Sequence, residues 1–415
     1  MDKKQIKVNQ ANTWEYIPDP DTILQYLERK DLIEFSKCCK RYRNQLKSRV
    51  FENLSLETWE RNNKEFYYEL KKSRRFEEAL EPLKISLGTK LKFVKIFTLH
   101  CEVGFGFAEI FVKLLPNIKT LKIMSVTIEF DCWLGEGLPT IFKGMVRLEH
   151  LYLYNVAPEI SCYNNESQVF SKSIKSLEIG CRIDSIDDDI LTIYDTIDTS
   201  YINLHSLTIV TNRMLQNLSS GMPNLKEVKI KEGFTMDQSK LVAFLKANRQ
   251  IKKLCTDQLR YNEEILNTVL SSKYFEYWDI YDWNWRDIDV NTLQSNYSIK
   301  YLIIDSAMPA PLTLQLINVC KILEALELEI NHETKDLDWS KLDRKINKLK
   351  LRYSRYTTNI IKEIDALRIF NSIHIEPNAY TRDHVNKYIN FKLNNYMLVP
   401  SLSKSCTLKL INKTE

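Results

Sequence analysis

Apolar residues recur along the chain in one short phrase, in which a second apolar residue follows three positions after the first and a third follows two positions later. From residue 251 onward, successive copies start 24, 24, 24, 23 and 24 residues apart. A period this regular predicts an array of repeated structural units. The complete copies are Val94/Phe97/Leu99, Ile118/Leu121/Ile123, Leu148/Leu151/Leu153, Ile174/Leu177/Ile179, Leu204/Leu207/Ile209, Leu225/Val228/Ile230, Phe275/Trp278/Ile280, Ile299/Leu302/Ile304, Leu323/Leu326/Leu328, Ile346/Leu349/Leu351 and Phe370/Ile373/Ile375.

The phrase itself predicts a β-strand. Its last two apolar positions are two residues apart, so a strand turns both side chains toward the same face. The copy that begins at Ile251 has Thr256 at its third position, and a terminal copy is expected to end at Leu408 and Leu410. Helical spacing of apolar residues lies between copies, and it predicts helices over residues 237–248, 262–272, 312–323 and 358–367.

A unit of strand, turn and helix cannot bury its apolar side alone, so neighbouring units must stack. The unit resembles the leucine-rich-repeat superfamily over residues 91–411. The resemblance implies an α/β fold, a leucine-rich-repeat solenoid over residues 91–415 with a curved parallel sheet inside and helices outside. The family's asparagine after the strand is matched only at Asn212, Asn331 and Asn378, so we expect an irregular solenoid.

Residues 13–56 follow a different pattern, in which capping signals precede apolar residues at helical spacing. Two prolines mark a turn, after which Asp21 is suited to cap a short helix. Asp31 is expected to begin a second helix, with Glu34 three residues later in a capping-box-like pair. These signals predict a small all-α module before the array.

This module resembles the F-box, a family whose pattern starts at Leu-Pro and continues through an Asp-Leu pair to Cys-Lys-Arg-Trp. Ile17-Pro18, Asp31-Leu32 and residues 39–42 (Cys-Lys-Arg-Tyr) stand at these motifs, although the stretch between Pro18 and Leu27 is shorter than in the family. The resemblance implies docking on a Skp-type adaptor and, through it, on a cullin–RING ubiquitin ligase, with the repeats binding a protein substrate. An F-box placed before leucine-rich repeats recurs in one large family.

By the same resemblance, seven residues become candidate adaptor contacts: Ile17, Pro18, Ile23, Leu24, Leu27, Leu32 and Phe35. The alternative for each is that it only holds the small helices together. Residues 57–90 are strongly charged, and we interpret them either as a helical linker or as a degenerate first repeat.

The residues that alternate with the core positions of each strand should line the concave side of the array. Aromatic side chains are frequent at interface hot spots, so clusters of tyrosine on this side are candidate substrate contacts. Trp283 and Trp285 follow one cluster, and the alternative is that rings such as these pack on each other or on loops. The candidate substrate-binding residues are Tyr277, Asp279, Tyr281, Tyr301 and Ile303, with Tyr152 and Tyr154, beside His150, in a second cluster.

Composition narrows the function classes. The formal net charge of +5 is small for 415 residues and is spread along the chain, whereas a nucleic-acid-binding protein usually has a concentrated basic stripe. No uncharged apolar run reaches the length of a membrane helix. Nine scattered cysteines suit reduced thiols in a cytoplasmic or nuclear protein. We therefore expect a protein partner rather than a nucleic acid or a membrane.

Catalytic patterns are sparse. The six histidines have no metal-ligand spacing, and no nucleophile or phosphate-loop motif is present. Cys255 and Cys320 fall inside repeat units, where cysteine is a common core filler. The aspartate-rich segment 181–201 is interpreted as an acidic loop, with an ion or basic-partner site as the alternative. We expect no enzymatic activity, cofactor or metal. A repeat scaffold or regulator without a ubiquitin-ligase role is the alternative function.

Overall fold

Strands and helices alternate along most of the chain in the computed structural model. The structure describes residues 24, 26–63, 77–100, 103–124, 137–154, 156, 168–180, 191–231, 236–257, 259–281, 285, 288–304, 308–332, 334–352, 357–376, 393–399 and 405–411. Within these ranges, all strands belong to one sheet with the order β1 to β13 followed by β15 and β14. From β1 to β13 each strand is parallel to its neighbour.

The strands are short and follow the apolar phrase. They are β1 (Asn53–Ser55), β2 (Ile96–Leu99), β3 (Thr120–Met124), β4 (His150–Tyr154), β5 (Ser176–Gly180), β6 (Ser206–Ile209), β7 (Glu227–Lys231), β8 (Lys253–Asp257), β9 (Tyr277–Tyr281), β10 (Tyr301–Ile304), β11 (Ala325–Glu329), β12 (Ile346–Arg352), β13 (Phe370–Glu376), β14 (Tyr396–Val399) and β15 (Cys406–Leu410).

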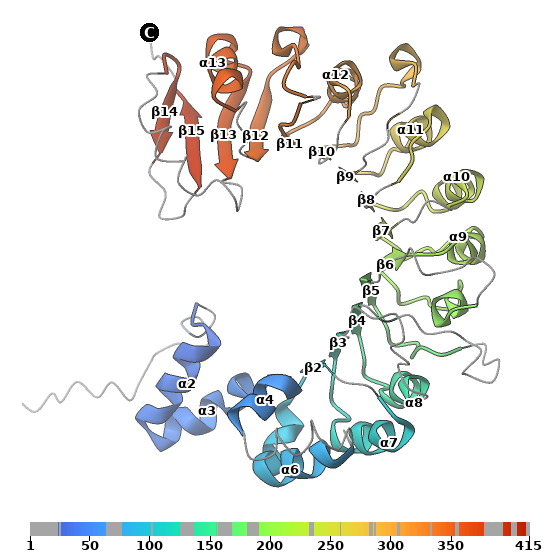
Figure 1. The fold of residues 1–415 in the computed structure, drawn as a ribbon, viewed down its shortest axis with the longest axis vertical. Helices are drawn as coiled ribbons and strands as arrows, with labels where there is room; N and C mark the ends of the chain where they lie inside the picture. Colours follow the sequence, from blue (N-terminus) through green and yellow to red (C-terminus); the bar gives the residue numbers. More distant parts are fainter. Residues whose placement is uncertain are drawn as a thin grey trace, which may run out of the picture.

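Two helices precede the first strand, and most of the others follow a strand in the chain. The helices are α2 (Arg29–Cys38), α3 (Lys40–Val50), α4 (Leu56–Asn62), α6 (Glu77–Leu87), α7 (Phe105–Leu114), α8 (Leu138–Gly144), α9 (Asn212–Leu218), α10 (Gln238–Ala247), α11 (Glu263–Leu270), α12 (Ala310–Val319) and α13 (Thr357–Leu367). Short 3-10 helices are η1 (Gly88–Phe93), η4 (Ile193–Thr196), η5 (Val290–Thr292) and η6 (Trp339–Lys341). The strands line the inside of an arc and α7 to α13 lie outside it (Figure 1).

The core lies between these two layers. Every apolar residue of the eleven complete phrases is buried, and the phrases of neighbouring units stand in register, as Trp278, Leu302 and Leu326 do across three strands. The strand register expected from the phrase is therefore the observed one. A long parallel sheet with helices outside, expected for the α/β fold, is confirmed.

Thr256 replaces an apolar residue in the core without leaving its hydroxyl unpaired. Its Oγ1 lies 2.6 Å from the Tyr261 hydroxyl and 3.1 Å from the carbonyl oxygen of Asp279. The Tyr261 hydroxyl also accepts a hydrogen bond from Trp278 Nε1 at 3.2 Å. A buried polar group is tolerated when it is hydrogen-bonded, which explains why this copy of the phrase still packs.

Two fully buried asparagines join neighbouring units. Asn296 Nδ2 donates to the carbonyl oxygens of Leu270 and Ser272, at 2.8 and 2.9 Å. Its Oδ1 accepts from the backbone N–H groups of Ser298 and Ile299. Asn248 connects the ends of α9 and α10 in a similar way. Both asparagines precede their strands by five residues, which differs from the position expected after the strand.

The three asparagines expected after the strand have more modest roles where they are described. Asn212 Oδ1 accepts from the backbone N–H of Asp237 in the next unit, at 2.6 Å. Asn331 Oδ1 accepts from the N–H of Thr334 within its own loop. Asn378 lies outside the described residues.

The C-terminal end departs from the expected terminal copy. Leu408 and Leu410 belong to β15, which runs antiparallel to β13, and β14 then pairs antiparallel with β15. The prediction of another parallel unit was wrong, because alternation of apolar residues predicts a strand but carries no information about its direction. Leu408 is still buried, so the hairpin covers the last apolar surface of the array.

The sheet begins earlier than residue 91. The strand β1 pairs parallel with β2, and Leu54, Leu56 and Trp59 join the main core together with Leu80 and Leu83 of α6. Leu80 and Leu83 of the described part of residues 57–90, together with Trp59, are thus packed on the array.

The N-terminal module is helical, as expected, but its second helix starts before Asp31. The helix α2 begins at Arg29, and the Asp31 carboxylate accepts a hydrogen bond from the N–H of Glu28 at 3.2 Å. Asp31 therefore caps the N–H of Glu28 from the first turn of the helix and is not itself the N-cap residue. The helix α3 begins after Cys39, whose Sγ accepts from the N–H of Tyr42.

No helix in the described ranges is long and apolar enough to span a membrane.

The register makes a stability prediction. Leu302 is 1% exposed, whereas Ile303 lies on the opposite face of β10 and is half-buried. We expect Leu302→Ala to cost about 2–5 kcal/mol of unfolding free energy, because it leaves a cavity in the core. Ile303→Ala should cost much less. Urea denaturation of both variants measures the difference, and equal losses would show that the register of β10 is wrong.

Candidate functional surfaces

The N-terminal module has a small core of its own. Leu24, Leu32, Tyr42 and Leu46 are buried together in it, separately from the core of the array. The rings of Phe35 and Tyr42 lie 4.6 Å apart between centroids. This second core explains how two short helices, α2 and α3, hold a fixed angle beside the array.

The predicted adaptor contacts divide into two groups. Leu24 and Leu32 are 6% and 7% exposed and hold the module together, whereas Leu27 and Phe35 pack on the same core while remaining partly exposed. Burial therefore gives Leu24 and Leu32 a positioning role and leaves Leu27 and Phe35 accessible. Ile17, Pro18 and Ile23 lie outside the described residues.

On the concave side, the structure brings the first tyrosine cluster together. Lys253, Tyr277 and Tyr301 are direct neighbours on β8, β9 and β10. The two tyrosine rings are 6.4 Å apart between centroids, and Lys253 Nζ lies 4.9 Å from the centre of the Tyr277 ring. Tyr301 is 44% exposed. This aromatic and basic row faces the inside of the arc, where a protein segment can reach it.

The neighbouring row on the same face, two residues further along these strands, is more polar. Cys255, Asp279 and Ile303 are direct neighbours in it, and Tyr281 pairs with Asp257 in the row beyond. Burial, followed by the nearby Asp279 carboxylate, raises the pKa of Tyr277 above its usual range, so its hydroxyl stays protonated and able to donate. The predicted residues of this cluster thus form one continuous surface on β9 and β10, which Lys253, Cys255 and Asp257 extend onto β8.

The second cluster also forms, on β4. Lys122 Nζ lies 5.0 Å from the Tyr152 ring centre, and the Tyr154 hydroxyl donates to Glu178 at 3.0 Å. A Cβ at Gly180 would stand 2.3 Å from the Tyr154 ring, so glycine is required for that ring to lie over β5. Burial and the hydrogen bond to Glu178 raise the pKa of Tyr154 to about 12. Five strand spacings separate β4 from β9, about 24 Å.

Trp285 belongs to the packing of the array rather than to the exposed cluster. It is half-buried, and its ring stacks on Tyr261 with 5.1 Å between centroids and an interplanar angle of 7°. Trp283 lies outside the described residues.

Sequence reasoning missed a charged network at the C-terminal end of the concave side. Lys350 Nζ lies 3.1 Å from Glu327 and 3.0 Å from Glu376, and Arg352 Nε lies 3.4 Å from Glu327. His374 Nδ1 is 2.9 Å from the Thr407 hydroxyl. Acidic and basic residues at the non-core positions of β11, β12 and β13 were the signal in the sequence that could have predicted this network. The charged groups of this region therefore neutralise one another.

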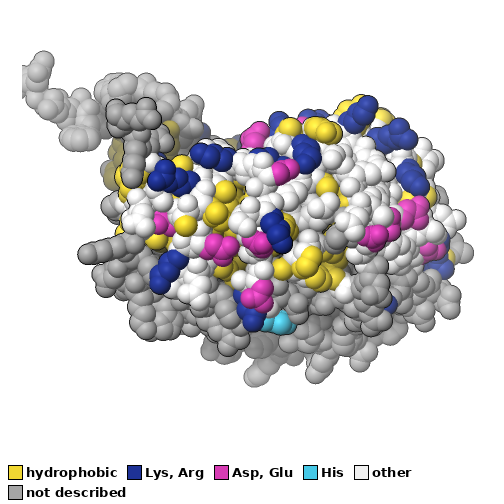
Figure 2. Space-filling model, turned by 90° about the horizontal axis from the view of Figure 1, so that it is seen from above, with side chains coloured by type: hydrophobic (Ala, Val, Ile, Leu, Met, Phe, Trp, Pro, Cys, Tyr) yellow, Lys and Arg dark blue, Asp and Glu magenta, His cyan; other side chains and the backbone are white. Residues whose placement is uncertain are grey.

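The two signs of charge are mixed on the surface as well. Seen from above the view of Figure 1, basic and acidic side chains alternate over the described surface, and neither sign makes a continuous stripe on that face (Figure 2). This agrees with the even spread of charge along the sequence.

Residues 21–54 match the family model of the F-box domain. The N-terminal module is an F-box domain. No curated protein matches the chain. Among solved structures, the chain is similar to a chain of the Rad7 and Elc1 complex in yeast, with 13% sequence identity and a TM-score of 0.39, over 65% of this chain and 76% of that chain.

Beyond the F-box, the described residues contain no group of three or more metal-ligating side chains. The described aspartates of the acidic segment have structural partners. Asp195 accepts hydrogen bonds from Thr192 and Thr211, and Asp198 accepts from the N–H of Ser200. These contacts give Asp195 and Asp198 a structural role, and Asp184, Asp187, Asp188 and Asp189 lie outside the described residues.

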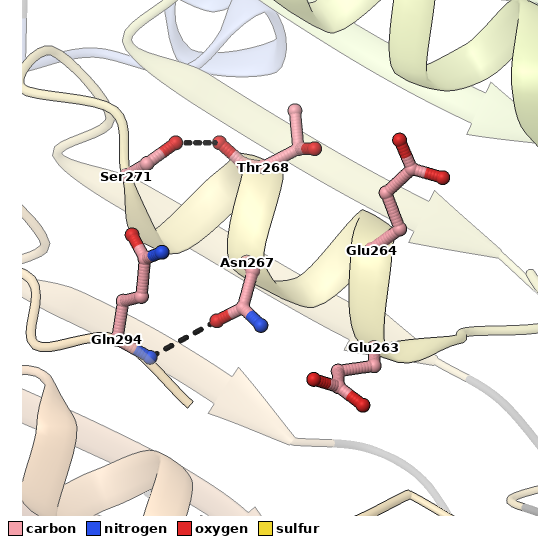
Figure 3. A pocket seen from close by; sticks show the side chains of 6 residues that line it. All are labelled: Glu263, Glu264, Asn267, Thr268, Ser271 and Gln294. Carbon is pink, nitrogen blue, oxygen red and sulfur yellow. Dashed lines mark hydrogen bonds between the residues drawn. The ribbon is translucent and has the colours of Figure 1, made fainter. Parts of the chain in front are cut away.

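A shallow hollow of about 510 Å³ lies beside α11 on the outer side of the arc. Glu263 and Glu264 line one end of it (Figure 3). At the other end Asn267 Oδ1 accepts from the N–H of Gln294, and Ser271 Oγ donates to the carbonyl oxygen of Thr268. The polar groups at that end join neighbouring segments.

The cysteines give a direct test of whether a nucleophile is present. Burial raises the pKa of Cys255 to about 11 and that of Cys320 to about 12, so both thiols stay protonated at neutral pH. Because the thiolate is the reactive form, iodoacetamide at about pH 8 should modify the exposed Cys38 well before either of them. Peptide mass spectrometry over time measures the rates.

Denatured protein, in which all three cysteines should react similarly, is the control for this experiment. If Cys255 in the folded protein reacted as fast as Cys38, an activated thiol would be present on the concave side.

Proposed function

We propose that the protein is the substrate-recognition subunit of an SCF-type cullin–RING ubiquitin ligase. The observation that carries the proposal is the F-box domain at residues 21–54, placed at one end of a curved array with a concave surface. F-box domains dock on Skp-type adaptors, which connect them to the cullin. In this assignment the protein brings a target to the ligase and has no catalytic activity of its own.

The array is proposed to be a leucine-rich-repeat solenoid. Three features support this assignment: the period of 23 or 24 residues in the C-terminal half, the parallel strand in each unit and the helix that follows most strands outside the arc. Asparagines that cap the turns before the strand, such as Asn296, take over part of the role of the missing asparagine ladder.

Adaptor binding is assigned to the F-box, with Leu27 and Phe35 as direct contacts and Leu24 and Leu32 as residues that hold the helices in place. Ile17, Pro18 and Ile23 remain predicted contacts from the resemblance alone. Substrate binding is assigned to the concave cluster of Tyr277, Asp279, Tyr281, Tyr301 and Ile303, with the cluster of Tyr152 and Tyr154 as a second contact for a large substrate.

Charged substitutions in the F-box test the adaptor assignment. Leu27→Asp together with Leu32→Asp should abolish co-purification of a Skp-type adaptor, because a buried charge without a partner costs several kcal/mol. Since Leu32 is a core residue, the double variant removes the module as a whole. Leu27→Asp alone, with helical content checked by circular dichroism, separates contact from folding.

Ile85→Asp is the matched control for these variants, since Ile85 is an apolar residue with 82% exposure outside the F-box. It should leave adaptor binding unchanged. Adaptor retained by the double variant would refute the ligase role and favour a repeat scaffold or regulator with no connection to ubiquitin.

The substrate assignment is tested on the concave side. Alanine at Tyr277, Tyr281 and Tyr301 together should remove the proteins that co-purify with the chain while adaptor binding persists, because aromatic residues dominate interface energy. Quantitative mass spectrometry of purified complexes measures both.

Tyr152→Ala with Tyr154→Ala gives the comparison on the same face, about 24 Å away. A smaller loss is expected for this pair. An unchanged set of partners in the triple variant would place the substrate site elsewhere on the array.

A further inference from the structure

A basic hollow lies at the lateral edge of the array, between the ends of α10 and α11 and the turns that lead into β8 and β9. Its volume is about 730 Å³. None of its lining residues is acidic, and three of them, Lys246, Arg249 and Lys273, are basic. Ligand sites commonly combine an apolar floor with a few converging polar groups.

This hollow has an apolar floor and a polar rim. Leu245 and Phe275 are 4% and 2% exposed and form an apolar floor. Tyr274 on the rim is 56% exposed. A hydrophobic residue with this much exposure next to an apolar floor offers contact area to a partner's side chain.

Two of the three cations on the rim are available to a ligand. Lys246 pairs with Glu264 at 3.3 Å. In the described part of the chain, neither Arg249 nor Lys273 lies within ion-pair distance of a carboxylate, and the one hydrogen bond described for the Arg249 side chain goes from Nε to the carbonyl oxygen of Lys246. Glu276, which follows Phe275 in the chain, pairs with Lys252 at 3.0 Å.

The turn that carries these groups is fixed from below. The carbonyl oxygen of Ser272 accepts from Asn296 Nδ2 and from Ser298 Oγ, and Ser272 Oγ accepts from the N–H of Tyr274. The backbone of this turn is therefore held before a ligand arrives, which lowers the entropic cost of ordering it on binding.

We propose that this hollow binds an acidic protein segment, in which carboxylates pair with Arg249 and Lys273 and an adjacent apolar side chain enters between Leu245, Phe275 and Tyr274. Charge complementarity selects the occupant, since the rim carries uncompensated positive charge. The adjoining hollow of Figure 3 shares Thr268 and Ser271 with it but is lined by Glu263 and Glu264, of which Glu264 pairs with Lys246. The proposal stands whether or not the F-box binds an adaptor.

The test measures fluorescence anisotropy of a labelled pool of short peptides rich in Asp and Glu, each with one large apolar residue, against the full-length protein. Arg249→Glu with Lys273→Glu should weaken binding by about tenfold or more, because charge reversal replaces attraction with repulsion. Lys113→Glu with Lys172→Glu is the matched control, since both lysines are exposed and lie outside the hollow. It should change affinity by less than about twofold.

Further ligand pools distinguish an acidic segment with an apolar residue from other ligands. A pool with Gln and Asn in place of the acids, and an acidic pool without the apolar residue, should each bind more weakly. The proposal is overturned by an equal loss in both double variants, by no binding of the acidic pool, or by tighter binding of a single-stranded RNA or a phosphoserine peptide pool than of the acidic pool. Lys273→Glu alone, with its melting temperature, shows that the loss does not come from unfolding.

Discussion

The structure depends on the burial of one apolar phrase between neighbouring units. A single strand and helix offer too little apolar surface to be stable alone, and each unit is completed by the next. Leu302, for example, sits in register with Trp278 on one side and Leu326 on the other. Because core residues occupy alternate positions in most strands, the side chains between them face the concave side of the array. The core and the concave surface are thus set by the same alternation.

Much of the fold could be predicted because this phrase is local. Its spacing gave the strand register throughout, and the capping residues Asp237 and Asn262 gave the starts of α10 and α11 within one residue. The start of α12 was placed two residues late because Pro309 and Ala310 have no capping signal of their own. The direction of β15 was missed because strand direction depends on tertiary pairing, which no local spacing encodes.

The surfaces were predicted less completely, for a different reason. Tyr277 and Tyr301 are 24 residues apart, and the repeat period was enough to bring them together. The basic hollow joins side chains from two helix ends and from two turns. The apolar phrase does not predict how side chains are oriented in those segments. In the F-box, Leu27 and Leu32 have similar apolar character in the sequence, and only the packing of α2 on α3 separates a core residue from an accessible one.

The parallel order from β1 to β13 also means that distances along the array come in multiples of one strand spacing. Each unit adds one strand to the sheet, so the separation of two sites along the concave side is counted in units. Gain or loss of one whole unit between β4 and β9 would keep all core positions in register. It would move Tyr152 relative to Tyr277 by a single strand spacing, about 4.8 Å. The distance between contact points can therefore change in discrete steps during evolution while the packing of every remaining unit is preserved.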